Sequence, residues 1–195
     1  MSLMNTLAGG RGTFRGLCYA ALVGAQFFAA ANACSTNCSI DVFFTGNYTD
    51  ETCNVAINNA SSNEIVTLPR VAVASLSRDG NEAGSVPFDI TLKDCPASRT
   101  ITVFFNSTIS AADTETGNLV NSSGTDLSRG VQIRLRKENS SQVIIDSADS
   151  GQDYVISATA EPLSHRFTAS YYAKGNSTVT AGQVHAVAGV ELVYK

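Results

Sequence analysis

The sequence is short of charge and of the side chains that enzymes use most. Only 15% of its 195 residues are Asp, Glu, Lys or Arg, Trp is absent, and His occurs twice. Soluble domains usually carry about 25% charged residues. Neither His165 nor His185 has a Ser, Asp or Cys partner in a recognisable motif, so no catalytic site, no enzymatic activity and no cofactor are predicted.

The net charge has the wrong sign for two classes of partner. It is −4, whereas binding to nucleic acid or to anionic lipid needs clustered Lys and Arg. No nucleic-acid partner is therefore predicted. Hydrophobic residues still make up 44% of the chain, which argues against intrinsic disorder because disordered chains are poor in apolar residues. Together with abundant Ser, Thr and Asn, this composition is typical of a secreted all-β protein.

Residues 1–33 are predicted to be a signal peptide. Arg11 and Arg15 precede an uncharged apolar run over 16–31, which ends in the cleavage pattern Ala31-Asn32-Ala33. A transmembrane helix is the competing interpretation, but the run is shorter than the ~20 apolar residues that a span needs. Export would place the mature chain in an oxidising compartment, where disulfides persist.

Four cysteines remain after this cleavage: Cys34, Cys38, Cys53 and Cys95. Their number allows two bridges in three connectivities. No C-x-x-C pair occurs and both His are distant from every Cys in the sequence, which disfavours a zinc site. A bridge between Cys53 and Cys95 would close a long loop and contribute about 4 kcal/mol through the entropy of the unfolded chain.

Alternation of apolar and polar residues dominates the mature chain. It predicts strands over 40–48, 88–93 and 131–136, while continuous apolar runs over 101–105 and 143–145 predict more deeply buried strands. Turn-rich stretches separate these segments, as is typical of a β-sandwich. No linker divides the chain, so one domain is predicted.

The C-terminal segment has the clearest pattern. Its residues on one face are Val184, Ala186, Ala188, Val190, Leu192 and Tyr194. A strand that runs to the penultimate residue leaves no residues to build a following strand beside it, and termini fray unless something holds them. Near the mature N-terminus a second strand has its own apolar face, made by Ile40, Val42, Phe44, Gly46 and Tyr48. Each end of the chain therefore offers a strand edge.

Four motifs occur in one order along the chain. Val42-Phe43-Phe44-Thr45-Gly46 is followed seven residues later by Cys53, and the pattern F-x-I-x-L-x-x-C occupies 88–95. The stretch Phe167-Thr168-Ala169-Ser170-Tyr171-Tyr172-Ala173-Lys174-Gly175 comes next, before Gly182 and the penultimate Tyr194. In this order and spacing the chain resembles the pilins of the chaperone–usher pathway, especially the major shaft subunits of type 1-like and P-like fimbriae.

The resemblance implies a fold and a mechanism. Pilins are incomplete immunoglobulin-like β-sandwiches that lack their last strand, and donor-strand exchange completes them. It implies a pilin domain over 49–195, an N-terminal extension over 34–48 and a Cys53–Cys95 disulfide. A periplasmic chaperone first lends a strand, and at the outer-membrane usher the extension of the next subunit replaces it. The exported product would be an extracellular fimbrium on the cell surface, a homopolymer of pilin subunits.

The resemblance also assigns residues to the two partners of the exchange. The donor residues would be Ile40, Val42, Phe44, Gly46 and Tyr48, with Gly46 as the small residue where a side chain would clash. The acceptor groove would be formed by Gly182, Val184, Ala186, Ala188, Val190, Leu192, Tyr194 and Lys195. The Lys195 carboxylate would lie in the basic cleft of the chaperone.

Some positions depart from the family pattern. Ser170 replaces the common Arg before the paired tyrosines, which leaves open what that neighbourhood pairs with. Phe43 places a large aromatic on the outward face of the donor strand, where it would pack on a neighbour in the fibre.

Arg134, Arg136 and Lys137 are interpreted as solvated charges on the polar face of an edge strand.

Cys34 and Cys38 are a further departure, because shaft pilins usually lack them. In an extended strand they would lie about 13 Å apart, too far for a disulfide, which needs Cα atoms within ~7 Å. Three explanations of the two cysteines are open: the segment before Ser39 bends, the two thiols pair between chains, or one thiol is modified. We expect a local bend with a Cys34–Cys38 bridge.

The predicted function is that of a structural, self-polymerising fimbrial subunit that supports cell adhesion. A minor, adaptor or tip subunit with an adhesive, glycan-binding role is the alternative. Two-domain tip adhesins need a separate lectin domain, which the mature length does not accommodate. An immunoglobulin-like ectodomain is disfavoured because such domains usually carry a core Trp, which this chain lacks.

Overall fold

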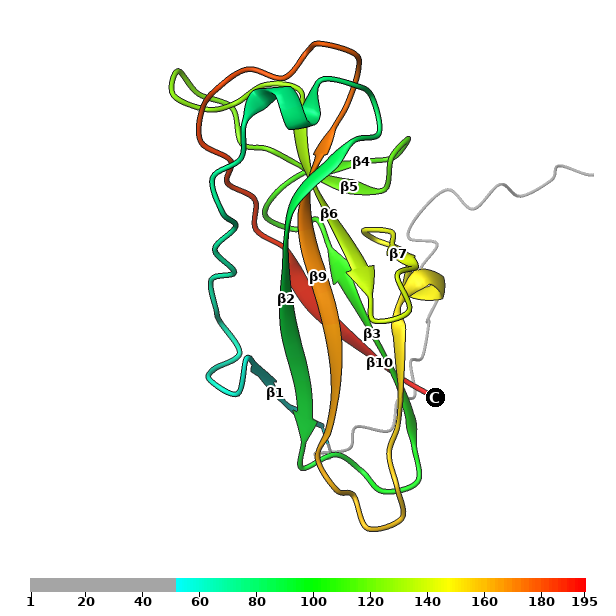
Figure 1. Ribbon diagram of the computed structural model, residues 1–195. Helices are drawn as coiled ribbons and strands as arrows, with labels where there is room; N and C mark the ends of the chain where they lie inside the picture. Colours follow the sequence, from blue (N-terminus) through cyan, green and yellow to red (C-terminus); the bar gives the residue numbers. More distant parts are fainter. Residues whose placement is uncertain (1–51) are drawn as a thin grey trace, which may run out of the picture. The chain divides into compact units, whose positions relative to one another are not determined.

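The computed structural model of the chain describes residues 52–195 (Figure 1). The predicted signal peptide over 1–33 and extension over 34–48 lie outside the described residues, and so do Cys34, Cys38, Ile40, Val42, Phe44, Gly46 and Tyr48. The elements of the described part are β1 (Asn54–Ile57), η1 (Val73–Leu76), β2 (Glu82–Lys93), β3 (Thr100–Asn106), β4 (Ala112–Asp113), β5 (Asn118–Val120), β6 (Val131–Lys137), β7 (Gln142–Val143), η2 (Ala148–Ser150), β8 (Gln152–Val155), β9 (Leu163–Ala173) and β10 (Gly189–Tyr194).

The strands form two antiparallel sheets. The larger has the order β1-β2-β9-β6-β5-β4, with β7 beside β6, and the smaller has the order β10-β3-β8. An immunoglobulin sandwich places its strands A, B, E and D in one sheet and C, F and G in the other. Here β1, β2, β9 and β6 occupy the places of A, B, E and D, and β3 and β10 those of C and F. Among the described residues nothing occupies the place of G, so the predicted incomplete all-β sandwich is confirmed.

Apolar residues that alternate with polar ones along the strands form the core between the two sheets. Phe88, Ile90 and Leu92 of β2 are buried as predicted, and three phenylalanines from different strands meet at the centre. The Phe167 ring lies 5.7 Å from the Phe88 ring in a stacked arrangement and 5.4 Å from the Phe105 ring edge to face. Aromatic pairs in these geometries add to the stabilisation that burial provides. The central strands β2, β3 and β9 are thereby fixed against one another.

Two glycines occupy places where a side chain would not fit. Gly84 has a φ of +66° and lies at the irregularity that shifts the pairing of β2 with β9 between Ala83 and Val86, a conformation that glycine adopts without strain. Gly182, a motif residue, has a φ of +154°, and a Cβ there would lie 2.5 Å from the backbone nitrogen of Ser128. The chain before β10 can pass this closely over the 126–128 loop only because residue 182 is glycine.

Three expectations from the sequence need correction. The predicted strand over 143–145 is a strand only at Val143, and Ile144 is 46% exposed because the chain turns after β7. The predicted C-terminal strand over 184–194 is regular only from Gly189 onward. The strand that carries Arg134 is no edge strand, because β6 lies between β9 and β5. In the part of the chain that the structure describes, no helix is long and apolar enough to cross a membrane.

Candidate functional site

Among the strands that the structure describes, none lies beside the outer edge of β10. Within residues 52–195, β10 pairs only with β3. The backbone groups of His185, Val187 and Lys195 bond toward β3 and the loops beyond it. Because the bonding direction alternates along an antiparallel strand, Val190 and Leu192 direct their N–H and C=O groups to the open edge. This edge can accept a further strand.

The apolar side chains of this edge face the core but are incompletely covered. Ala186, Ala188, Val190 and Leu192 pack against the main core cluster and remain only partly buried, and Val184 packs in the same way against a second, smaller cluster. Their alternation is the one that the sequence predicts. Residues 184–188 are held by isolated hydrogen bonds to loop residues instead of a strand ladder. The Asn121 Oδ1 accepts from the His185 amide at 2.7 Å, and the His185 carbonyl accepts from the Ser122 amide at 3.0 Å.

A second segment completes this apolar surface. Val55 of β1, and Val66 and Leu68 of the extended segment 62–71, pack against the same main cluster while partly exposed, and Val71 packs on the smaller cluster. In the described part β1 pairs only with β2. Within residues 52–195, no hydrogen bond between two backbone groups involves residues 62–71. We call the half-buried apolar residues of 54–71 and 184–192, with the open edge of β10, the acceptor surface.

Tyr194 and the disulfide mark one end of the acceptor surface. The Cys53 amide donates a hydrogen bond to Tyr194 Oη at 2.8 Å, which joins the start of β1 to the end of β10. Cys53 is bonded to Cys95, which follows β2, so the predicted pairing is confirmed. The Lys195 amide donates to the Thr100 carbonyl at 2.9 Å, and its Nζ lies 3.3 Å from the Asp153 carboxylate. The backbone therefore stays paired with β3 to its last residue.

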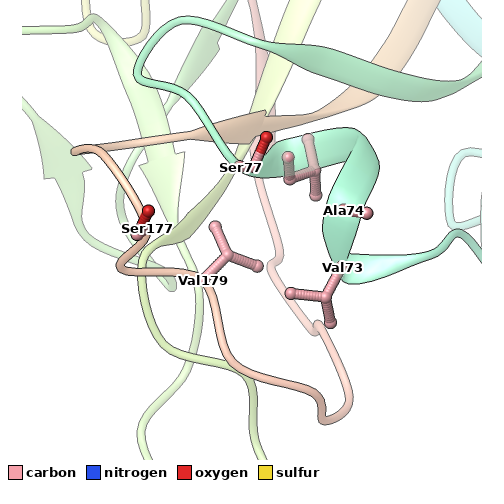
Figure 2. A pocket seen from close by; sticks show the side chains of 6 residues that line it. Val73, Ala74, Ser77, Ser177 and Val179 are labelled. Carbon is pink, nitrogen blue, oxygen red and sulfur yellow. The ribbon is translucent and has the colours of Figure 1, made fainter.

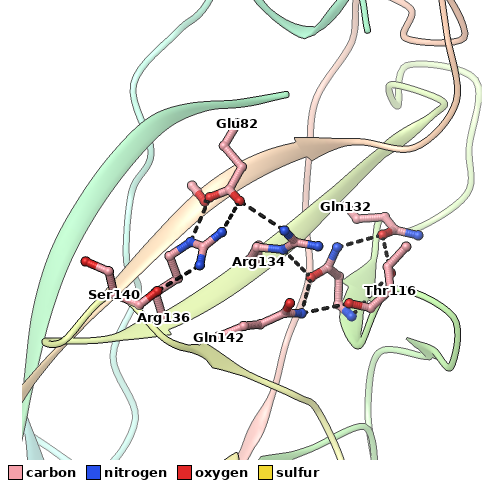
Figure 3. A network of polar contacts seen from close by, with 9 residues as sticks. Glu82, Thr116, Gln132, Arg134, Arg136, Ser140 and Gln142 are labelled. Atoms are coloured by element: carbon pink, nitrogen blue, oxygen red, sulfur yellow. Dashed lines mark hydrogen bonds and ion pairs between the residues drawn. The ribbon is translucent and has the colours of Figure 1, made fainter. Parts of the chain in front are cut away.

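The outer face of the large sheet carries a network of polar side chains (Figure 3). Glu82 of β2 accepts hydrogen bonds at 3.1 Å from Arg134 Nη1, Arg136 Nε and Ser170 Oγ. Burial raises the pKa of the Glu82 carboxyl, but the hydrogen bond and charge of Arg136, with the bonds from Ser170 and Arg134, outweigh burial and lower it. The interpretation of Arg134 and Arg136 as solvated edge charges is wrong, because both guanidinium groups pair with Glu82 across β9.

The same network explains the serine at position 170. Ser170 is buried, and its hydroxyl reaches the Glu82 carboxylate. The Arg134 guanidinium lies 3.9 Å from the centre of the Tyr172 ring and donates from Nε to Asn118 Oδ1 at 3.0 Å. Arginines of β6 thus supply the positive charge on this face, and residue 170 only needs to donate one hydrogen bond.

A second acidic side chain lies close to this network. Asp113 of β4 pairs with Lys174 and accepts hydrogen bonds from Gln132 Nε2 and from the amides of Glu115 and Thr116. The bond from Lys174 and these other donors lower the pKa of Asp113 to about 2, against the opposing effect of burial. Throughout the described chain, buried side-chain nitrogen and oxygen atoms all have a hydrogen-bond partner.

Other places in the described residues offer little chemistry. A small, mostly apolar pocket of about 190 Å³ lies beside η1, lined by Val73, Ala74, Leu76, Ser77, Ser177 and Val179. Figure 2 shows these side chains. The pocket holds two serine hydroxyls but no titratable group, so it contains no acid–base pair. The His165 ring lies 4.6 Å from the buried Tyr154 ring, edge to face. Within residues 52–195 no group of three His, Cys, Asp or Glu side chains could hold a metal ion.

The sequence pattern predicts one side of the acceptor surface but not the other. The alternation from Val184 to Leu192 identifies the first side. The segment 62–71 went unnoticed because only Val66 and Leu68 alternate within it, between the exposed Ile65 and Pro69. The Glu82 network was missed as well. The absence of the common Arg at position 170 was the available signal, because it indicated that the positive charge had to come from another strand.

Comparison with known proteins places the chain among subunits of surface fibres. The family described as "Fimbrial protein" matches residues 42–195. The serotype 3 fimbrial subunit of Bordetella pertussis is 29% identical, with 78% of this chain and 85% of that protein covered. The minor fimbrial subunit HifD of Haemophilus influenzae is 32% identical, with 74% and 68% covered. In fold the chain is similar to the P pilus rod subunit PapA, with a TM-score of 0.56, 18% identity, and 73% and 99% covered.

Proposed function

The chain belongs to the fimbrial protein family, and on that premise we propose that it polymerises by donor-strand exchange. It is a structural subunit of a fimbria of the chaperone–usher pathway, and such subunits are exported to the cell surface as extracellular fimbriae. What remains to be assigned is how one subunit joins the next. The observation that carries the proposal is that no described residue fills the place beside β10, where the last strand of an immunoglobulin sandwich would lie.

The N-terminal extension of a second copy is the proposed occupant of this place. Its residues Ile40, Val42, Phe44, Gly46 and Tyr48 alternate along one face, as a strand added to an open edge requires. Burial of each of the three large aliphatic and aromatic side chains at 40, 42 and 44 contributes about 1.5–3 kcal/mol. Backbone bonds to the free N–H and C=O groups of β10 add to this. The resulting polymer dissociates very slowly.

A periplasmic chaperone and an outer-membrane usher are the proposed partners before polymerisation. An open edge with apolar surface beside it pairs with other chains and aggregates unless it is covered. The acceptor surface therefore needs a temporary strand in the periplasm, which the chaperone supplies. We assign the Lys195 carboxylate, at the end of the paired β10, to the basic cleft of that chaperone.

The proposal is tested by supplying or withholding the donor strand. A chain that begins at residue 49 is expected to aggregate, whereas the same chain with residues 39–48 fused after Lys195 through a flexible linker gives a soluble monomer with one cooperative thermal transition. A matched fusion with Ile40, Val42 and Phe44 changed to Ser is the control and should aggregate. A soluble, cooperatively folding monomer without any donor would overturn the proposal.

A minor or adaptor role is the second candidate, and the similarity to a minor subunit favours it. Electron microscopy of cells that lack the gene distinguishes the two roles. Loss of whole fibres identifies a shaft subunit, whereas fibres that persist without their tip structure identify an adaptor. The adhesive, glycan-binding role stays a prediction, and glycan-array binding by purified fibres tests it.

A further inference from the structure

One end of the acceptor surface is closed by a contact between its two walls. The Tyr194 side chain extends from β10, the edge strand of the small sheet, to the Cys53 amide before β1, the edge strand of the large sheet. The hydrogen bond is 2.8 Å long. We call the Tyr194 side chain and the Cys53 amide the clasp. At its opposite end, near Val184, no described hydrogen bond joins residues 62–71 to residues 184–188.

The clasp is held firmly from both sides. Cys53 is linked covalently to Cys95 at the end of β2, and Tyr194 is paired with Ile101 in the ladder of β10 and β3. The amide of the next residue, Lys195, also bonds to β3. Because the disulfide and the strand ladder hold the backbones of the two partners, the Tyr194 side chain closes this end of the gap between the two edges as long as its hydrogen bond to Cys53 is formed.

We propose that Tyr194 is a positioning residue: the clasp stops the incoming strand and thereby sets the register in which one subunit joins the next. This inference rests on the proposed donor-strand exchange and goes beyond it. The last strand of an immunoglobulin sandwich runs antiparallel to the strand that β10 represents, so the N-terminal side of the donor is directed toward Tyr194. The first apolar donor residue, Ile40, must then stop before the Tyr194 ring.

This stop excludes any pairing that brings Ile40 past Leu192, and the number of positions selects one of the pairings that remain. The clasp leaves open as many core-facing acceptor positions as the donor has positions on its apolar face. The resulting pairs are Ile40 with Leu192, Val42 with Val190, Phe44 with Ala188, Gly46 with Ala186, and Tyr48 with Val184.

Side-chain volumes agree with this register. Residues directly opposite in an antiparallel pair share a face and contact each other. The largest central donor, Phe44, is opposite the small Ala188, and Gly46 is opposite Ala186. A slip by two residues toward the C-terminus would place Ile40 against the Tyr194 ring and Phe44 against Val190, which crowds the surface. A shift by one residue would turn the apolar face of the donor outward.

Disulfide trapping in assembled fibres reads the register directly. Subunits that carry V42C with V190C report the proposed pairing, and subunits that carry V42C with L192C report the slipped one. Cα atoms directly opposite in an antiparallel ladder lie within the range that a disulfide spans. We expect covalent multimers from the first pair on non-reducing gels and almost none from the second. Mass spectrometry of the linked peptides separates these bridges from any that involve Cys34 or Cys38.

The role of the clasp is tested by removing only its hydroxyl. Y194F keeps the ring but loses the bond to Cys53, and a bond of this kind corresponds to about a fivefold change in an equilibrium. We expect the ratio of V42C–L192C to V42C–V190C product to rise about fivefold in Y194F. Y172F, on the outer face of the large sheet, is the matched control and should leave the ratio unchanged. Co-expression with an excess of V42C subunits keeps fibres assembled if Y194F polymerises poorly alone.

The outcomes separate this inference from the function on which it rests. An unchanged ratio in Y194F, or a dominant V42C–L192C product with Tyr194 intact, overturns the clasp as the stop while donor-strand exchange stands. Fibres in which residue 42 forms no bridge to any cysteine placed along β10 overturn the donor assignment itself.

Discussion

Two surfaces of the sandwich differ in how far their polar groups are hydrogen-bonded and their apolar side chains are buried. On the outer face of the large sheet, Glu82, Arg134 and Ser170 bond to one another across β2, β9 and β6. At the acceptor surface, the edge of β10 has free backbone groups, and apolar residues such as Val190 and Leu192 remain half-buried. Both surfaces are built from strands of similar alternation, yet residues 52–195 complete one of them and not the other.

The difference shows where the subunit depends on a partner. A network whose polar groups are all paired within one chain gains little from a second molecule, because each of its bonds would have to be broken and replaced. An open strand edge gains backbone bonds and buries apolar area without losing any internal contact. The polar face thus stabilises the single subunit, and under the proposed donor-strand exchange the acceptor surface would stabilise the polymer.

The largest effect is expected from a charge placed on the acceptor surface. V190D would bury a carboxylate under the donor strand, and burial of an unpaired charge costs several kcal/mol, so surface fibres should fall on the order of 100-fold. V155D is the control, because Val155 is 70% exposed on β8 of the same sheet. Fibres are counted by electron microscopy of cells that express each variant. Equal loss in both variants would remove the distinction between the two surfaces.

An intermediate effect is expected from breaking the polar network. E82Q leaves Arg134 and Arg136 without their carboxylate, whose side chain is 22% exposed. Because charged groups left without a partner cost about 1–3 kcal/mol, the free energy of unfolding should fall by about 2 kcal/mol, whereas fibres still assemble. Guanidinium denaturation of purified fibres, followed by circular dichroism, measures the change.

The matched control for E82Q is D89N. Asp89 pairs with Arg166, whose side chain is 58% exposed, and exposed ion pairs contribute about 0–1 kcal/mol. D89N should therefore destabilise the subunit less than E82Q. If E82Q instead abolished polymerisation while the subunit stayed folded, the polar face would be part of the subunit interface and the comparison would be wrong.

The smallest effect is a dependence on acid pH. The folded pKa of Asp113 is lowered to about 2, below its ordinary value near 3.8. A carboxyl with a depressed pKa contributes stability above its unfolded pKa and loses that contribution as the pH falls through its folded pKa. Fibres should lose this contribution between about pH 4 and pH 2, by less than about 1 kcal/mol because Lys174 is exposed.

D113N removes this contribution. Its melting temperature should vary less with pH than that of the unchanged protein between pH 4 and pH 2, in thermal scans of purified fibres. Identical pH profiles for the two proteins would show that Asp113 gains nothing from Lys174 in the folded state.

Much of the sandwich follows from local alternation in the sequence. Phe88, Ile90 and Leu92 face the core because a period of two places them on one side of any strand. The strand β10 is shorter than the alternating pattern because its partner, β3, ends at Asn106, which lies opposite Gly189. Residues 184–188 keep the alternation but form only isolated hydrogen bonds to loop residues. Hydrophobic pattern therefore predicts which side a residue faces better than where a strand begins.

The parts that could not be predicted depend on contacts between distant segments. Glu82 meets Ser170 and Arg136 only because β9 lies between β2 and β6, an arrangement that no local pattern contains. The bond from Cys53 to Tyr194 joins the two ends of the described chain. Tyr194 could be assigned from its motif, but its partner could be identified only from the fold.

The disulfide beside the clasp has a mechanical consequence. Under the proposed donor-strand exchange, a fibre in tension would pull each subunit at Cys53, the start of the described domain, and along β10, the proposed acceptor of its neighbour's extension. β1 has only four residues paired with β2 and alone would peel away from that strand one bond at a time. The Cys53–Cys95 bridge passes the load to the end of β2 instead. The neighbour's strand, pulled along its own axis, then resists in shear, with all its backbone bonds loaded together.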